Sequence, residues 1–332
     1  MSKFIYSMSI IGFGLMLGYA LQVLAGRGLI RLPLPTDRLR KLLQQVALLG
    51  VNPVAIVGAI WAIRGHHLGL VVLPFIGFFA LMAGGLLALA AARLMELPPR
   101  KTGAMFGCGS FTNIGSIGAL ICFVFLGEPG FALVPIYKMF EETAYYAIGF
   151  PIAKYYSDQR SASETLWARV RRLARDPFIL TALASILTGG ALNLSGVERP
   201  EGFATLNAVL VPLATVMLLT SIGLAMRFRR VRDYLKESAA VAVIKFVLVP
   251  ASAATLAWWF GLGGIHDGLP LKVVIILSAM PVAFNALIPP SLYDLDLDLA
   301  NSCWFVTTFM LALVLGVLSF IGVFVWVLQR AG

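Results

Sequence analysis

The sequence predicts an integral membrane protein built of α-helices, with ten transmembrane helices in two halves of five. Three observations carry this prediction. The 332 residues are 59% hydrophobic and only 13% charged, whereas an ordinary soluble domain is about 25% charged. Apolar windows of membrane-spanning length recur along the whole chain, and the basic residues gather in alternate connections between them. These features exclude a soluble globular domain.

The apolar windows define the expected spans. A helix needs roughly 20 apolar residues to cross the hydrocarbon of a bilayer. The windows lie at residues 4–25, 42–62, 68–94, 104–126, 131–155, 177–195, 204–226, 238–262, 271–291 and 299–328. The first window resembles a secretory signal, but only Lys3 precedes it and five basic residues follow it. Because a signal carries its positive charge in front, we interpret this window as a membrane span.

The distribution of Lys and Arg predicts the orientation. Nineteen of the 26 basic residues follow the first, third, fifth and seventh spans, five lie on the opposite side, and Lys138 and Lys245 fall inside spans. Basic loops stay in the cytoplasm. We therefore expect a multi-pass protein of the bacterial plasma (inner) membrane with both termini on the outer, periplasmic side. The acidic run Asp294, Asp296 and Asp298 is expected in a solvated outward loop.

The longest polar segment, residues 156–176, divides the chain into equal halves. Residues 1–155 form the predicted first repeat, 156–176 a cytoplasmic loop, and 177–332 the second repeat. Because each half holds an odd number of spans, the second half must insert upside down relative to the first half. Two such halves form an inverted-topology repeat. Pro53 in the second span has a counterpart in Pro212 of the seventh.

Two apolar stretches are poor helices. Residues 106–127 interleave Gly with Ser, Thr and Asn, and residues 278–290 hold Pro281, Pro289, Pro290 and Asn285. Gly costs about 1 kcal/mol against Ala inside a helix, and non-helical backbone at membrane depth is tolerated only where protein buries it or a wet cavity borders it. Paired interrupted segments, one in each half, are typical of a transporter's binding site. The alternative interpretation is tight helix packing through small residues.

Three ionisable residues lie in the middle of the fifth span, where such groups are costly and mark ion or substrate paths. Lys138 and Glu142 are spaced i, i+4, so we expect them to pair on one face that Tyr145 continues. Glu141 then remains available for a cation or a proton. The alternative is a structural salt bridge, with Glu141 bonded to a neighbouring span. Lys245, near the start of the eighth span, is expected to extend to the membrane interface.

Several stretches resemble one family of membrane proteins. Residues 110–118 with 125–132, residues 176–180 with 211–214 and 222–224, and Ala279-Met280-Pro281 with Asn285, Leu299-Ala300 and Thr307-Thr308 are similar to the auxin efflux carrier family of permeases, which includes bacterial malate- and malonate-type permeases. The resemblance covers nearly the whole chain in order. It implies a five-plus-five inverted repeat like the bile-acid/sodium symporter fold, with broken fourth and ninth spans that cross at the substrate site. It also implies a homodimer formed through the scaffold.

The chain departs from the family in one respect. Family members usually carry Pro in the second part of span four, where this chain has Ala119-Leu120. A break at Gly115 and Gly118 is expected to replace it.

The functional hypothesis is a secondary active transporter of small organic anions, such as carboxylates, that works by alternating access. Spans one, two, six and seven would form a scaffold, and the other six would form a core that moves in an elevator-like or rocking manner. The predicted substrate-binding residues are Asn113, Gly115, Ser116, Lys138, Tyr145, Pro281 and Asn285. The predicted ion-coupling residues are Thr112, Glu141, Glu142 and Thr308. No cofactor is expected beyond a Na⁺ or H⁺ that drives transport, and the lipid bilayer is the other partner.

Two alternatives remain open. A sodium/proton antiporter would place Asp residues beside the crossing, and no predicted span contains Asp. A membrane sensor or binding module would need an output segment, whereas the central loop is short and basic. The three Cys and three His residues form no disulfide framework, metal site or nucleophile–base pair. An enzyme is therefore not expected, and a basic surface for nucleic acid is not expected either.

Overall fold

The computed structural model describes residues 2–62, 68–157, 171, 175, 177–226 and 231–331. Within these ranges the chain is helical, without a β-strand. The N-terminal helices are α1 Ser2–Gly26, α2 Thr36–Gln45, α3 Asn52–Trp61, α4 Leu73–Leu94, α5 Pro99–Ser110, α6 Ala119–Tyr137, α7 Glu141–Thr143 and α8 Phe150–Tyr155. The C-terminal helices are α10 Pro177–Leu194, α11 Gly202–Gly223, α12 Leu235–Val243, α13 Val249–Trp259, α14 Leu269–Ser278, α15 Ile288–Leu292 and α16 Leu297–Ala331. Most of the central loop, residues 156–176, lies outside the described residues.

Seven helical segments in the described ranges are long and apolar enough to cross a membrane. Their length and composition support a multi-pass membrane protein. One of the seven, Ile114–Tyr155, is 42 residues long. It is divided at Gly127, whose φ of 74° and ψ of −167° turn the chain between two helices. The windows at 104–126 and 271–291 do not form single long helices because each is interrupted.

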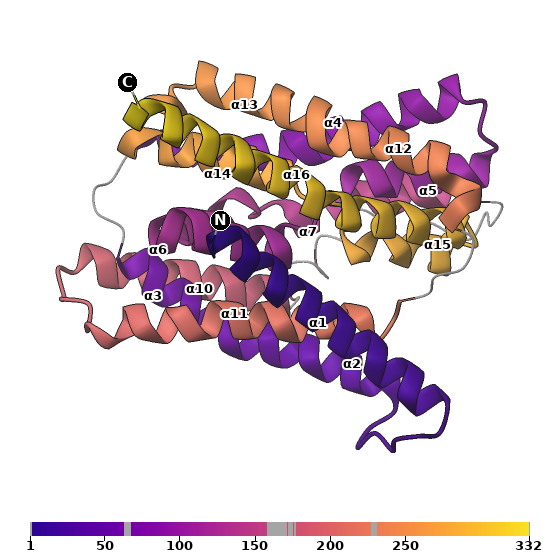
Figure 1. The fold of residues 1–332 in the computed structure, drawn as a ribbon, viewed down its shortest axis with the longest axis horizontal. Helices are drawn as coiled ribbons and strands as arrows, with labels where there is room; N and C mark the ends of the chain where they lie inside the picture. Colours follow the sequence, from indigo (N-terminus) through magenta and orange to yellow (C-terminus); the bar gives the residue numbers. More distant parts are fainter. Residues whose placement is uncertain are drawn as a thin grey trace.

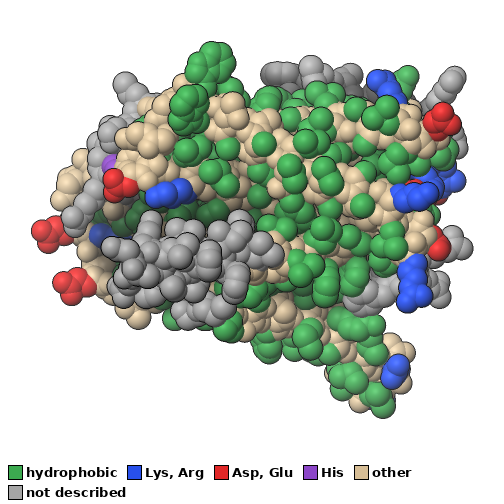
Figure 2. All heavy atoms as spheres, turned by 45° about the horizontal axis from the view of Figure 1, so that its top comes forward, with side chains coloured by type: hydrophobic (Ala, Val, Ile, Leu, Met, Phe, Trp, Pro, Cys, Tyr) green, Lys and Arg blue, Asp and Glu red, His purple; other side chains and the backbone are tan. Residues whose placement is uncertain are grey.

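The helices form two layers (Figure 1). In one layer α1 packs along α11 and α3 along α10. In the other, α4 packs against α5, α12 along α16, and α13 against α14. Helix α6 contacts both α3 and α14 and so lies between the layers. Hydrophobic side chains cover the middle of the face in Figure 2, and charged side chains lie mainly toward its two ends. This is the surface that a helix bundle presents to lipid.

Polar groups connect the turn in the middle of α6 to the layer that contains α10 and α11. Arg199 donates to both carboxylate oxygens of Glu128, at 2.8 and 2.6 Å. The Asn207 amide on α11 donates to the same carboxylate at 2.7 Å. Glu128 follows Gly127 in the turn within α6, so one hydrogen bond ties this turn to α11 and two tie it to Arg199 in the connection before α11.

The acidic run after α15 lies beside a basic connection, and the predicted outward placement is wrong. Arg100 pairs with Asp294 at 2.8 Å, and Tyr234 donates to Asp296 at 3.0 Å. Arg100 follows the third expected span and Tyr234 lies among the basic residues after the seventh. A chain that starts on the side opposite the basic loops and crosses the membrane nine times also ends on the side of the basic loops. The Asp residues therefore balance positive charge there instead of marking the opposite face.

Glycines set the approach of α1 to α11. A Cβ at Gly18 would overlap the Thr220 carbonyl oxygen, and one at Gly223 would overlap the Leu15 carbonyl oxygen. The backbones of the two helices therefore touch, as in the small-residue contacts of membrane helices.

We expect Gly18→Leu to lower the free energy of unfolding by at least about 1–3 kcal/mol, because the added side chain must separate α1 from α11. Thermal unfolding in detergent measures this change. Gly12→Leu is the matched control, since a Cβ at Gly12 has no neighbour within 4 Å. Equal unfolding temperatures for the two variants would contradict the close contact.

Candidate functional site

The two interrupted segments cross at their breaks. Helix α5 ends at Ser110 and α14 at Ser278, and an antiparallel bridge pairs Thr112 with Val282. Asn113 N donates to Pro281 O at 2.9 Å, and Ala283 N donates to Phe111 O at 3.0 Å. The backbone N–H and C=O groups that lose their helical partners at one break thus bond to backbone groups of the other segment. Buried backbone in a membrane protein requires such partners.

The break in the first segment precedes the glycines that were expected to cause it. Phe111 has an extended conformation, with φ −78° and ψ 122°, and Asn113 has φ −78° and ψ 63°. A π-helix then begins at Ile114 and includes both Gly115 and Gly118. The predicted break at Gly115 and Gly118 is therefore wrong. Pairing with the Pro281 segment, which the local sequence does not reveal, fixes the break at Phe111–Asn113.

Tyr145 supports the crossing through buried contacts to Thr112, Glu141 and Phe111. Its hydroxyl accepts from Thr112 N at 2.9 Å and lies 2.9 Å from Glu141 Oε1 and 3.2 Å from Thr112 O. Its ring stacks on Phe111, with the ring centroids 4.0 Å apart. The side chain is 1% exposed. Tyr145 is thus a structural support of the site, and it is not among the residues that line the central cavity.

A cavity of about 290 Å³ lies at the crossing. Eight of the predicted site residues line it: Thr112, Asn113, Gly115, Ser116, Lys138, Glu141, Glu142 and Asn285. Tyr146, Gln44, Ser221 and Phe284 also line it. Gln44 and Ser221 were not predicted because their segments have no unusual pattern, and Tyr146 and Phe284 were not predicted although they lie in segments that the sequence singled out. We call this space the central cavity. Its concave shape and mixed lining are those of a small-molecule site.

Two asparagines offer amide groups to the central cavity. Asn113 Oδ1 accepts from Ser116 Oγ and from Ile117 N, so the Asn113 side chain caps the helix that follows. This leaves Asn113 Nδ2 buried without a partner among the described residues, and the residue is only 6% exposed. Asn285 lines the same cavity from the other segment. A buried unpaired donor costs about 1–3 kcal/mol, so an acceptor that entered the cavity and bonded to Asn113 Nδ2 would remove this cost.

The charged residues pair differently from the prediction. Lys138 Nζ lies 2.8 Å from Glu141 Oε2, an i, i+3 pair, so Glu141, which was expected to remain available, is paired. The reason is local: α6 ends at Tyr137 and residues 138–140 form a turn, so the i, i+4 geometry of a continuous helix does not apply. Gly115 leaves room for the Lys138 amino group, which would lie 3.0 Å from a Cβ there.

Two further residues differ from expectation. Lys245 was expected at the membrane interface, but it is 1% exposed, and its Nζ lies 2.6 Å from Thr112 Oγ1. That prediction is wrong because a π-helix in the middle of the α12–α13 segment directs this side chain inward. Thr308 does not line the central cavity, and its buried hydroxyl has no partner among the described residues. Its neighbour Thr307 instead accepts from Val282 N at 3.2 Å.

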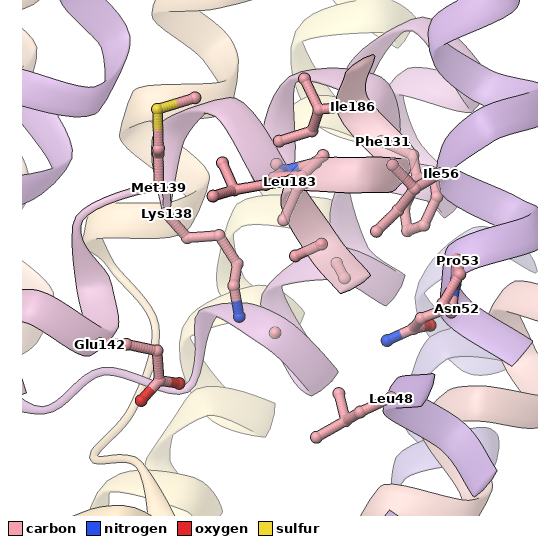
Figure 3. A pocket seen from close by; sticks show the side chains of 15 residues that line it. Leu48, Asn52, Pro53, Ile56, Phe131, Lys138, Met139, Glu142, Leu183 and Ile186 are labelled. Carbon is pink, nitrogen blue, oxygen red and sulfur yellow. The ribbon is translucent and has the colours of Figure 1, made fainter. Parts of the chain in front are cut away.

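Two other cavities adjoin the central one. A smaller pocket of about 120 Å³ shares Lys138, Glu142, Gly115 and Leu48 with it. Figure 3 shows Lys138 and Glu142 on one side of this pocket and Asn52 with Pro53 on the other. A wider cavity of about 740 Å³ shares Phe284 and Ile288 with the central cavity and is lined by Asp37, Arg40 and Asp298. The three spaces extend from the apolar pocket to the end of the molecule where the basic connections lie.

Comparison with known proteins gives distant relatives. No family model matches the chain. It is 24% identical over 242 residues (73% of this chain and 75% of the relative) to an uncharacterized transporter of Methanothermobacter thermautotrophicus. It is 24% identical over 253 residues (75% and 78%) to an uncharacterized transporter of Methanocaldococcus jannaschii. It is 26% identical over 216 residues (64% and 65%) to a Rhizobium meliloti protein named "Putative malonate transporter". These similarities support a membrane transporter, and the more specific resemblance to auxin efflux carriers stays a prediction.

Replacing Tyr145 tests whether its hydroxyl stabilises the crossing. We expect Tyr145→Phe to lower the free energy of unfolding by about 1–3 kcal/mol, because Thr112 N–H and a Glu141 oxygen each lose a buried partner. Thermal unfolding of the purified variant measures the loss. Tyr155→Phe is the control, since Tyr155 is 83% exposed. An unchanged stability for Tyr145→Phe would show that the crossing does not depend on this hydroxyl.

Proposed function

We propose that the chain is a secondary active transporter of small organic anions, with a dicarboxylate of malonate size as the first candidate. The observation that carries the proposal is the pair of amide groups at the crossing. Asn113 Nδ2 is buried and unpartnered, and Asn285 faces the same cavity from the other segment. Amide N–H donors bind a carboxylate strongly because the acceptor is charged. The printed name of the Rhizobium meliloti relative agrees with this substrate class.

The helix ends add positive potential. A helix begins at Ile114 immediately after Asn113, and another short helical segment begins at Phe284 next to Asn285. A helix N-terminus carries about half a positive charge. The anion therefore meets amide donors and a helix N-terminus at the crossing, as at the midplane sites of other secondary transporters.

The side-chain charges favour coupling to a cation. Lys138, Glu141 and Glu142 line the central cavity, so their formal sum is one negative charge. Bringing a dianion into this space is unfavourable unless positive charge accompanies it. A proton or a Na⁺ that enters with the substrate satisfies this requirement. Transport is accordingly driven by an ion gradient, with Glu141 and Glu142 as the groups that respond to the ion.

The wide cavity supplies the route to one side. Arg40 lines it, and the guanidinium carbon lies 6.0 Å from the centroid of the Phe284 ring that borders the central cavity. Arg40 Nε is buried without a partner among the described residues. A cation at this position raises the local concentration of anions before they reach the crossing.

We also propose the membrane topology that the positions of the apolar windows and of the basic residues predict. The chain crosses the membrane ten times as two inverted repeats, and the broken segments are the fourth and ninth spans. The layer of α1, α2, α3, α10 and α11 is the scaffold, and the other layer moves against it. Because α6 belongs to the fourth and fifth spans of the moving core, the hydrogen bonds between Glu128 and Arg199 must separate when the core moves.

Removing the amide of Asn285 tests the binding site. We expect Asn285→Ala to keep the unfolding temperature of the ligand-free protein while weakening malonate binding about 10- to 100-fold, because one hydrogen bond to a charged group is worth about 1.5–3 kcal/mol. Thermal shifts with malonate and uptake of labelled malonate into proteoliposomes measure the effect.

The matched control for this variant is Asn193→Ala, which removes an amide that donates to Trp61 O outside the cavity. It should leave the malonate affinity unchanged. If no mono- or dicarboxylate stabilises the wild-type protein or enters proteoliposomes under a Na⁺ or H⁺ gradient, the proposed function is wrong.

Cysteine labelling tests the orientation. Cys108, Cys122 and Cys303 are buried, so they give a low background. On spheroplasts, a membrane-impermeant maleimide should label Lys272→Cys, and it should label Lys236→Cys only after the membrane is opened. Both positions are exposed. Labelling of Lys236→Cys in sealed spheroplasts would reverse the proposed orientation.

A further inference from the structure

A buried lysine lies directly behind the wall of the central cavity. Lys245 belongs to the π-helix Ile244–Leu248 between α12 and α13, and its side chain is among the largest fully buried ones. Its Nζ donates to Thr112 Oγ1 at 2.6 Å and lies 3.5 Å from Ser110 O. Thr112 in turn lines the central cavity. The ammonium therefore lies one residue behind the surface that the substrate would touch.

The partners of this ammonium are oxygens of the broken segment. Among the described residues, no carboxylate forms an ion pair with Lys245. Ser110 is the last residue of the 12-residue helix α5, so its carbonyl is at the negative end of the helix. The helix end and the Thr112 hydroxyl are the groups that would stabilise a positive charge on the Lys245 amino group.

This arrangement has the chemistry of an alkali-ion site. In secondary transporters, unwound backbone carbonyls and the C-terminal ends of half-helices coordinate the Na⁺ that drives transport. Here the corresponding oxygens, Ser110 O and Thr112 Oγ1, surround a lysine ammonium. An ammonium and a Na⁺ are both compact monovalent cations that bind oxygen, and only the ammonium is attached to the chain.

We propose that Lys245 is a built-in replacement for a coupling Na⁺, and that it positions the Thr112–Asn113 segment for the anion. The inference rests on the proposed function for the identity of the substrate class. It narrows the coupling ion of the proposed function to the proton, because anion binding then does not require Na⁺. Lys245 acts on the substrate through Thr112 and the amide of Asn113 next to it. Lys245 is therefore a positioning residue and a fixed positive charge of the site.

The experiment measures malonate affinity for the purified protein by thermal shift, in choline chloride, NaCl and methylammonium chloride at equal ionic strength. The wild-type protein should bind malonate with the same affinity in all three salts. Lys245→Ala should bind at least about tenfold more weakly in choline and recover in Na⁺ or methylammonium, which can occupy the space left by the side chain. Lys245→Met removes the charge but fills this space, so it should lose affinity without recovery.

Three outcomes would overturn the inference. The first is a wild-type protein that binds malonate only with Na⁺, which is decisive even if no variant folds. The second is an unchanged malonate affinity of Lys245→Ala in choline. The third is a loss of malonate affinity in Lys245→Ala that neither Na⁺ nor methylammonium restores. If the wild-type protein binds no carboxylate in any salt, the proposed function fails. The inference is then tested alone by stabilisation with Na⁺, which should occur for Lys245→Ala and not for the wild-type protein or Lys245→Met.

Discussion

The backbone pairing between Phe111–Asn113 and Pro281–Ala283 is the contact on which the rest of the site depends. Each segment leaves a helix in the interior of a membrane protein, where an unsatisfied peptide group costs several kcal/mol. The hydrogen bonds from Asn113 N to Pro281 O and from Ala283 N to Phe111 O remove much of this cost. Because the helices restart immediately afterwards, the pairing also directs two helix beginnings and two asparagines into one cavity.

Charge around the crossing is arranged on both of its sides. Lys138 and Glu141 pair in the cavity wall, and Tyr145 connects Glu141 to the Thr112 backbone. Lys245 contacts the same residue through the Thr112 hydroxyl. A change of charge in the cavity therefore acts on the same short extended segment as the buried lysine does. Under the proposed function, this shared contact is the physical route by which ion and substrate binding would influence each other.

Much of the fold was readable from the sequence, whereas the detailed pairing at the site was not. Composition predicted a helical membrane protein, and the Gly-rich and Pro-rich stretches predicted the two interruptions. The exact break at Phe111–Asn113 depends on contact with residues about 170 positions away, which local propensity does not encode. The partner of Lys138 was missed because the helix was assumed to continue through residues 138–140. The inward direction of Lys245 was missed because its position near a basic loop favoured the interface.

The most direct test of the central claim is an experimental structure of the protein with malonate bound. The account predicts density for the dicarboxylate in the central cavity, within hydrogen-bonding distance of Asn113 Nδ2 and the Asn285 amide. Density confined to the wide cavity beside Arg40, or a cavity at the crossing that stays without the anion at saturating malonate, would contradict it.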